Sequence, residues 1–346
     1  MTTGEAPAPA ERAASAGASR TSTGAPGLPA PSGPTLSQRL SAAGLIAGVK
    51  VIRALPEGLV YRAAYAAGLG LSLVLRSRRR LLRRNLQRVV GYLDANGMAN
   101  PRTMAAAHSD RALDAMVRSA FGHWVVTYAE SARAPGYDTA ALRERVRLED
   151  PASVHSALGP VTPGAKGVLF IGLHFGAVEI GALFAVKTGS VPIAGPMESV
   201  ANPVMREYFE RTRRNLGVEV YPIKGIAPIL RERLANGLGV ALVADRVIEG
   251  SGARATLFGV EVRIPAGPAM LAVETGARLC FISVRRDDRP GRWIGRVEEV
   301  AVPAEGSRRE RIEAVMGDHA RWIERTVARA PEQWWTLLFP VWEDIR

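Results

Sequence analysis

The chain has 346 residues, 47% of them apolar, which is enough to bury a sizeable core in one large domain with appendages or in two domains. Its single cysteine, Cys280, excludes an intrachain disulfide and a cysteine-based metal site, and the spacing of its five histidines predicts no other metal site. A formal net charge of +12 indicates an anionic partner, such as nucleic acid, an anionic membrane or a phosphorylated substrate.

The first segment, residues 1–35, is dominated by Ala, Pro, Ser, Gly and Thr and shows no periodicity. This composition predicts a disordered tail. It does not predict a signal peptide, because no apolar core follows a basic start. The rest, 36–346, is expected to combine an apolar and basic helical part over 36–100 with an α/β core over 150–346.

The segment 36–75 is apolar and rich in small residues, and it is interrupted at Pro56. Its longest uncharged run, 63–75, has 13 residues, whereas a helix needs about 20 to cross a bilayer. Seven arginines and no acid follow within 76–88. An apolar helix with a basic flank is typical of a segment that lies on a membrane surface, although a solvated helix face is the alternative. No nucleic-acid-binding motif is present, so no nucleic-acid partner is expected.

Residues 103–133 show helical periodicity, and from about residue 150 strands and helices alternate. The predicted strands are 168–173, 191–194, 218–221, 240–244 and 279–284, and the predicted helices are 175–186, 203–216, 226–236, 267–276 and 308–330. This alternation predicts an α/β fold with a mixed, mostly parallel central sheet flanked by helices. Near the end, Trp334 and Trp335 are expected either to pack at an edge of the core or to sit at a lipid interface.

The most informative stretch runs from Val168 to Glu179. Residues 168–173 form an apolar run typical of a strand that is covered on both faces, and it ends at His174. Glu179 follows at the start of the next predicted helix, where its side chain is expected to approach the imidazole. The carboxyl edge of the sheet is where open α/β folds bind ligands. A histidine with an acidic partner can act as a general base, although a buried structural pair is the alternative.

Other charged residues follow neighbouring predicted strands. Glu198 follows one strand, and Asp245 and Arg246 follow another, which predicts one shared polar cleft. In the helix 203–216, Arg213 is a candidate to grip a phosphate or a carboxylate, and Arg263 flanks a proline-rich turn. No phosphate-binding loop, dinucleotide fingerprint or nucleophile elbow is present. The simplest chemistry is therefore direct transfer from an activated acyl donor to a hydroxyl group.

The sequence from His174 to Glu179 resembles the H-x4-D/E motif of the bacterial lipid acyltransferases, a superfamily that includes the lipid A late acyltransferases. Within it, the chain is most similar to the phosphatidylinositol mannoside acyltransferases. The resemblance spans roughly 38–346 and is carried by the motif and by further segments, namely 197–198, 213–220, 244–246, 258–272 and 275–277.

The resemblance implies an acyl-CoA donor with no further cofactor, an anionic lipid or glycolipid acceptor, and a peripheral enzyme at the cytoplasmic face of the cell membrane. It also implies that His174 is the base and that Glu179 orients and supports it. The residues it assigns to substrate binding are Glu198, Arg213, Asp245, Arg246 and Arg263. Two alternatives stay open at this point. One is a lysophospholipid or lipid A-type acyltransferase, and the other is a non-enzymatic basic protein that binds membranes or nucleic acid.

Overall fold

The computed structural model describes residues 33–160, 164–198, 200–247 and 252–345. The predicted disordered tail lies almost entirely outside the described residues. The helices of the N-terminal part are α1 (Leu36–Ala54), α2 (Glu57–Val74), α3 (Arg76–Ala95), α4 (Pro101–His108), α5 (Asp110–Arg133), α6 (Thr139–Arg145) and α7 (Pro151–Leu158). The later helices are α8 (Val178–Thr188), α9 (Pro203–Asn215), α10 (Ala227–Ala235), α11 (Gly267–Thr275) and α12 (Arg308–Val327).

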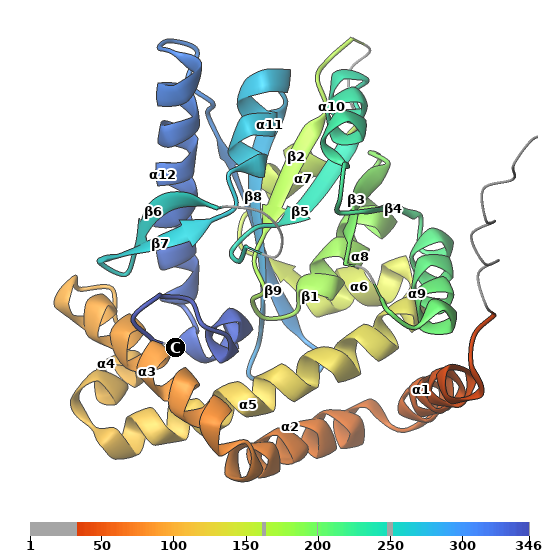
Figure 1. Ribbon diagram of the computed structural model, residues 1–346, viewed down its shortest axis with the longest axis vertical. Helices are drawn as coiled ribbons and strands as arrows, with labels where there is room; N and C mark the ends of the chain where they lie inside the picture. Colours follow the sequence, from red (N-terminus) through yellow and green to blue (C-terminus); the bar gives the residue numbers. More distant parts are fainter. Residues whose placement is uncertain (1–32, 161–163, 199, 248–251, 346) are drawn as a thin grey trace, which may run out of the picture.

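A seven-stranded sheet forms the centre of the molecule, with helices on both faces (Figure 1). Its strands are β1 (Val146–Leu148), β2 (Val168–Gly172), β3 (Ile193–Met197), β4 (Val218–Pro222), β5 (Gly239–Val243), β8 (Arg278–Arg286) and β9 (Trp293–Val300). Their order is β1-β9-β8-β2-β5-β3-β4, and every neighbouring pair is parallel except β8 and β9. The predicted α/β class with a mixed, mostly parallel sheet is therefore confirmed.

Strand β2 lies at the middle of this sheet, and its side chains divide between two cores. Leu169 and Ile171 pack into the core that contains residues of α3, α5, α11 and α12, whereas Val168 and Phe170 pack into the core beneath α6, α7 and α8. All five residues of β2 are buried. This two-sided burial explains why the segment is continuously apolar, and it places the end of β2 deep in the molecule.

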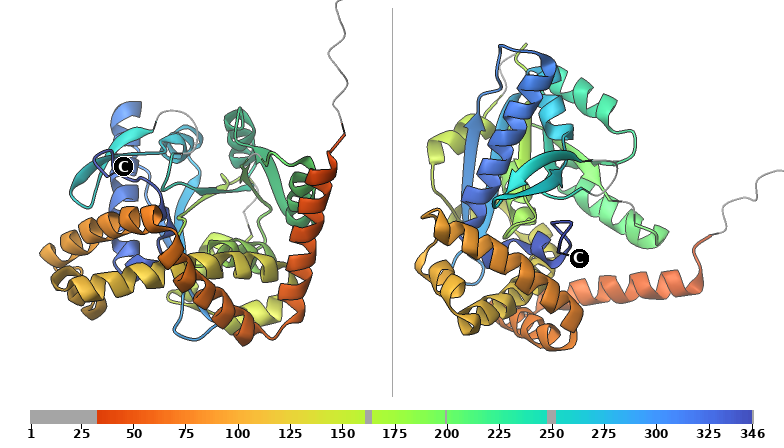
Figure 2. Two further views of the ribbon diagram at one scale, coloured as in Figure 1. Left: turned by 60° about the horizontal axis from the view of Figure 1, so that its bottom comes forward. Right: turned by 60° about the vertical axis from the view of Figure 1, so that its left-hand side comes forward.

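The N-terminal helices wrap around one end of the sheet. Helix α1 ends just before Pro56, and α2 begins directly after it, because proline suits the first turn of a helix but not its interior. Figure 2 shows α1 running along the side of the molecule from α2 towards α9. Among the described residues no single helix is both long enough and apolar enough to cross a membrane. Helices α2 and α3 reach that length and hydropathy only when they are taken together, and the pair is bent by 100°.

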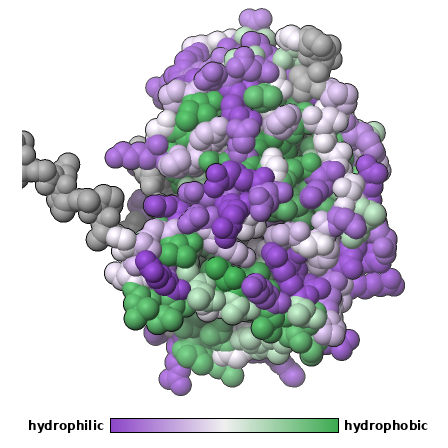
Figure 3. Space-filling view, turned by 90° about the vertical axis from the view of Figure 1, so that its right-hand side faces the viewer, coloured by the Kyte–Doolittle hydropathy of each residue, from purple (hydrophilic) through white to green (hydrophobic). Residues whose placement is uncertain are grey.

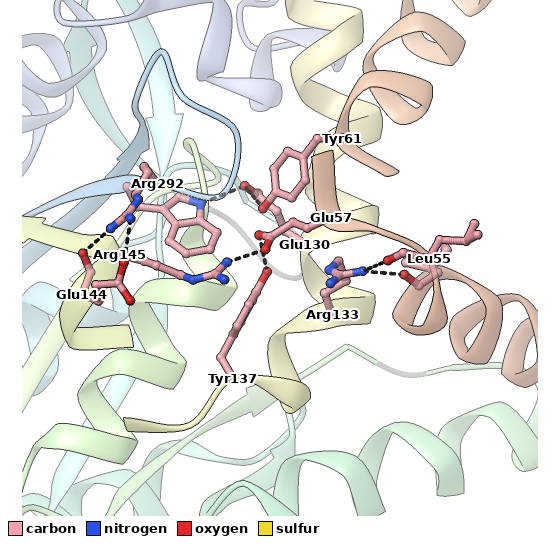
Figure 4. A network of polar contacts seen from close by, with 11 residues as sticks. Leu55, Glu57, Tyr61, Glu130, Arg133, Tyr137, Glu144, Arg145 and Arg292 are labelled. Carbon is pink, nitrogen blue, oxygen red and sulfur yellow. Dashed lines mark hydrogen bonds and ion pairs between the residues drawn. The ribbon is translucent and has the colours of Figure 1, made fainter. Parts of the chain in front are cut away.

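Polar contacts fix the corner between α1 and α2 to the body of the protein (Figure 4). Glu57, at the start of α2, accepts a hydrogen bond from the Tyr137 hydroxyl at 2.8 Å and pairs with Arg145. Arg133 donates from Nη1 to two carbonyl oxygens of this corner, those of Ile52 at 2.7 Å and Leu55 at 3.0 Å. The N-terminal helices are thus attached to α5 and α6 through directed contacts as well as by packing.

A buried ion pair joins the same helices to the sheet. Glu130 of α5 receives Arg286 of β8 at 2.5 Å, and the two side chains are 1% and 5% exposed. The other oxygen of Glu130 accepts hydrogen bonds from Tyr61 of α2 at 3.2 Å and from the indole of Trp293 at 2.8 Å. Arg286 compensates the charge of this carboxylate inside the core, and the two neutral donors satisfy its other oxygen.

The structure departs from the predicted elements in several places, and helices α6 and α7 are among the elements that were not predicted. The helical segment predicted over 103–133 is two helices, because Asn100 and Ser109 cap separate helix starts with their side chains. Four strands were not predicted, namely β1, β9 and the antiparallel hairpin of β6 (Ala253–Leu257) and β7 (Val260–Ile264). β1 is only three residues long, every second residue of β6 and β7 is exposed, and the second half of β9 carries charged residues. These strands therefore lack the long apolar runs on which the prediction relied.

Candidate functional site

His174 and Asp245 lie side by side at the carboxyl edge of the sheet. Strands β2 and β5 are parallel neighbours in which Gly172 pairs with Val243, so the two residues each follow the last register pair by two positions. The His174 Nδ1 atom lies 2.7 Å from Asp245 Oδ1, and the backbone N–H of His174 donates to Oδ2 at 3.1 Å. The sheet register therefore builds a histidine–carboxylate pair from residues 71 positions apart in the chain.

The side chain of Asp245 is fully buried and receives two more hydrogen bonds. The Trp334 indole and the Thr336 hydroxyl each donate to Oδ2 at 2.7 Å. Burial acts to raise the pKa of Asp245, but the neighbouring His174 and the hydroxyl and indole donors outweigh it, and the pKa lies well below its ordinary value. Asp245 is thus held as a carboxylate at neutral pH.

The imidazole of His174 is mostly enclosed, with 11% of its side chain exposed. The ring of Trp335 packs edge-on against it, with 4.4 Å between the ring centroids. Within the described part of the chain the Nε2 atom makes no hydrogen bond, and it is not sealed from solvent. A base whose Nδ1 faces a carboxylate and whose Nε2 has no partner among the described residues is arranged to take a proton from a bound group.

A tight turn follows the histidine and leads into α8. Gly176 adopts a left-handed φ of 55°, and a Cβ atom at this position would lie 2.1 Å from the carbonyl oxygen of Val284. Only glycine fits this turn without a shift of β8. The turn places Glu179 in the first turn of α8, as the sequence predicted.

The predicted contact between Glu179 and His174 is not among the contacts of the described residues. Glu179 pairs with Arg213 of α9 at 3.1 Å, and its side chain is 43% exposed. The carboxylate at the imidazole belongs instead to Asp245, which the sequence analysis had assigned to the substrate cleft. The reason is geometric: Asp245 follows a strand bonded directly to β2, whereas Glu179 lies beyond the turn on the first part of a helix.

Two more predicted residues lie at the same edge. Arg246 stacks over the ring of Phe339, with its Cζ atom 4.5 Å from the ring centroid, and pairs at 3.5 Å with Glu198, which follows β3. One shared polar cleft was predicted for the charges at these strand ends, and these two side chains do meet there. Whether they bind a substrate stays a prediction.

Arg263 is the remaining residue that was predicted to bind substrate. It belongs to the β6–β7 hairpin, where its guanidinium donates to the carbonyl oxygen of Gly252 at 3.0 Å. This contact fastens the base of the hairpin. The structure thus gives Arg263 a local structural contact, while the other predicted residues lie on the strand ends and on helices α8 and α9.

The C-terminal residues were not predicted to belong to the site. Of the two alternatives for the tryptophan pair, packing at the core holds for Trp334, which is 1% exposed. The indole also donates to Asp245, as does Thr336. The available signal was a Trp-Trp-Thr cluster of side-chain hydrogen-bond donors in an apolar segment, since buried indoles and hydroxyls need acceptors.

Sequence comparison identifies the kind of protein to which this site belongs. The family model described as bacterial lipid A biosynthesis acyltransferase matches residues 37–342. The chain belongs to this acyltransferase family. It is 30% identical over 259 residues to a phosphatidylinositol mannoside acyltransferase of Mycolicibacterium smegmatis, a match that spans 71% of this chain and 77% of the relative.

A protein of the same name from Mycobacterium tuberculosis is 45% identical over 71 residues, which cover 19% of this chain and 22% of the relative. Membership of the acyltransferase family confirms the predicted enzyme class and the predicted superfamily. The histidine–carboxylate pair is the arrangement in the described residues that suits acyl transfer, because such transfer to a hydroxyl needs a base for the hydroxyl proton.

Proposed function

We propose that this acyltransferase moves a long fatty acyl chain from acyl-CoA to a sugar hydroxyl of a membrane glycolipid similar to a phosphatidylinositol mannoside. The observation that carries the chemistry is the His174–Asp245 pair, with Nδ1 at the carboxylate and Nε2 without a hydrogen-bond partner among the described residues. The name of the mycolicibacterial relative supports the choice of acceptor. The enzyme class supports an acyl donor and a lipid acceptor.

In the proposed reaction His174 acts as the general base. Asp245 holds the proton on Nδ1, so the lone pair of the neutral ring is on Nε2. Nε2 takes the proton of the acceptor hydroxyl while the hydroxyl oxygen attacks the thioester carbonyl carbon. The tetrahedral intermediate then expels the sulfur of coenzyme A, and the imidazolium returns the proton to the leaving thiolate. The products are an ester and a free thiol.

Charged side chains around the pair are proposed to receive the charged parts of the substrates. Arg246 directly follows Asp245, and its side chain is 25% exposed, with the guanidinium over the ring of Phe339. Arg213 is 33% exposed on α9. A partly exposed guanidinium can bind a phosphate of the donor or of the acceptor headgroup through paired hydrogen bonds.

The N-terminal helices are proposed to hold the enzyme at the cytoplasmic face of the cell membrane. Large apolar side chains are exposed on α1 and α2, among them Leu36, Leu40, Leu59, Leu73 and Val74 at 54–74% exposure. Figure 3 views the molecule from the right-hand side of Figure 1. It shows apolar surface gathered at the lower end, where α1 and α2 lie in Figure 1. The arginine-rich start of α3 follows directly and would attract anionic lipid headgroups.

The test is thioester cleavage with purified full-length protein, a long-chain acyl-CoA and total polar lipids of an actinobacterium. The proposal expects release of free thiol together with a newly acylated glycolipid, and His174→Ala is expected to lose both while keeping its thermal unfolding transition. Transfer only to lysophospholipids would overturn the acceptor. No thiol release by the wild-type protein would overturn the reaction and leave a lipid-binding role.

A further inference from the structure

The C-terminal segment holds the histidine–carboxylate pair from outside the sheet. Asp245 Oδ2 accepts hydrogen bonds from Trp334 Nε1 and Thr336 Oγ1, each at 2.7 Å, and from the backbone of His174. Both donors come from a segment 89 and 91 residues away along the chain. Because Asp245 is fully buried, these donors replace the water that would otherwise solvate its charge.

The same segment also holds the backbone around His174. The N–H of Trp335 donates to the carbonyl oxygen of His174 at 3.1 Å, and the N–H of Gly176 donates to the carbonyl oxygen of Gln333 at 3.0 Å. Phe175 and Trp334 form an isolated antiparallel bridge. The position of the histidine and the orientation of its carboxylate partner therefore depend on the stretch 333–336 as well as on the sheet register.

We propose that Trp334 and Thr336 are positioning residues for acyl transfer, and that their two hydrogen bonds to Asp245 set how strongly this carboxylate stabilises protonated His174. This inference rests on the proposed function. Each donor draws negative charge towards Oδ2, on the side away from the imidazole, which is bound at Oδ1. Loss of one donor leaves more charge available to the imidazolium and leaves the carboxylate freer to rotate.

Other charged or titratable groups surround the pair and must stay constant in any test. His319 of α12 interacts electrostatically with Asp245, and its burial lowers its pKa to about 4, so it is neutral near pH 7. Arg246 is stacked on Phe339 and paired with Glu198, and Glu179 is paired with Arg213. None of these contacts involves the indole of Trp334 or the hydroxyl of Thr336.

The decisive variants remove one donor and keep the shape of the side chain. Trp334→Phe removes the indole N–H, and Thr336→Val replaces the hydroxyl by a methyl group. Each is expected to lower kcat about tenfold and to leave KM for acyl-CoA within about twofold. The midpoint of the acid limb of the pH–rate profile is expected to move to a pH about half a unit higher. Thr336→Ser, which keeps the hydroxyl, is expected to recover most of the activity.

The chain offers a matched control for each variant. Trp342 is also 1% exposed and Thr103 is 0% exposed, but within the described residues the Trp342 indole N–H and the Thr103 hydroxyl make no hydrogen bond. Trp342→Phe and Thr103→Val therefore make the same chemical change at comparable burial. Both are expected to leave the pH–rate profile unchanged.

A second measurement does not depend on turnover. The His174 ring is titrated by NMR in each variant, with its signal assigned by its absence in His174→Ala, and its titration midpoint is expected to rise in Trp334→Phe and Thr336→Val only. An unmoved midpoint in both variants, or an equal rise in the two controls, overturns the inference. A raised midpoint in a protein that releases no thiol supports the positioning role and contradicts the proposed acyl transfer instead.

Discussion

His174 and Asp245 occupy equivalent positions just past the ends of two neighbouring parallel strands, each two residues beyond the Gly172–Val243 register pair. Parallel neighbours bring their carboxyl ends to one edge, so side chains at matching positions meet there. The pair is therefore a product of sheet register, and a 2.7 Å contact results without any closeness in sequence.

The first prediction concerns the carboxylate. Asp245→Asn keeps the acceptor oxygen for Trp334 and Thr336 but turns an N–H group towards His174 Nδ1, which stabilises the wrong tautomer of the ring. We expect kcat to fall by about 10²- to 10⁴-fold, with little change in KM. Steady-state thiol release measures both quantities. A variant with more than a third of wild-type kcat would show that the carboxylate does not support the base.

The second prediction concerns the ion pair of Glu179 and Arg213. Both side chains are partly exposed, so the pair should contribute only about 0.2–1 kcal/mol to the free energy of unfolding. If the two act as a unit, Glu179→Gln, Arg213→Gln and the double variant should lose similar amounts of activity. Urea unfolding and thiol release on the four proteins of this cycle give the coupling. If Glu179→Gln shifted the pH–rate profile while Arg213→Gln had no effect, Glu179 would instead act directly on His174.

The third prediction concerns the buried pair of Glu130 and Arg286. Glu130→Gln leaves the guanidinium of Arg286 buried without its counter-charge. We expect the free energy of unfolding to fall by about 3–5 kcal/mol. The control is Arg309→Gln, which breaks a pair whose side chains are 88% and 59% exposed and should leave the free energy of unfolding nearly unchanged. Urea unfolding followed by circular dichroism measures both, and equal effects would contradict the assigned role.

The fourth prediction concerns stability at acid pH. Burial lowers the pKa of His319 to about 4, so the folded protein keeps this imidazole neutral while the unfolded chain takes up a proton below about pH 6.5. The stabilising effect is complete above that pH and is lost as the pH falls towards 4. The free energy of unfolding should drop by about 1.4 kcal/mol per pH unit from this residue.

His319→Phe tests that slope, because phenylalanine can keep the stacking on Phe281 and Trp322 without titrating. Its unfolding free energy should fall less steeply between pH 6.5 and 4, by about 1.4 kcal/mol per unit. His155→Gln removes an exposed imidazole and should keep the wild-type slope. Burial also lowers the pKa of His123, to about 3, so part of the acid sensitivity should persist in both variants.

The fifth prediction concerns membrane binding. Leu73 and Val74 are 62% and 74% exposed at the end of α2, directly before the arginine-rich start of α3. The double change to serine should weaken binding to anionic vesicles about tenfold, because apolar area is no longer buried in the lipid. Vesicle sedimentation at two salt concentrations measures the affinity. Ile229→Ser, on α10 at the other end of the molecule, serves as the control and should bind like wild type.

Much of the fold could be predicted because its signals are local. The apolar run of β2, the apolar strands β5 and β8, and the helices between them follow from composition and periodicity within short windows. The antiparallel β9 and the β6–β7 hairpin carry weaker patterns, because one side of each is partly exposed. Their places depend on pairing between segments, which a short window does not contain.

The sequence by itself determined that a histidine ends a buried central strand, that charged residues end its neighbours, and that an apolar and arginine-rich helical part precedes the sheet. Only the tertiary structure decided that Asp245 meets His174, that Glu179 turns to Arg213, and that Trp334 and Thr336 hold the carboxylate. The reason is physical. A residue's strand position is fixed by its near neighbours, whereas the partner of a buried charge is fixed by sheet register and by chain segments about 70 to 90 residues away.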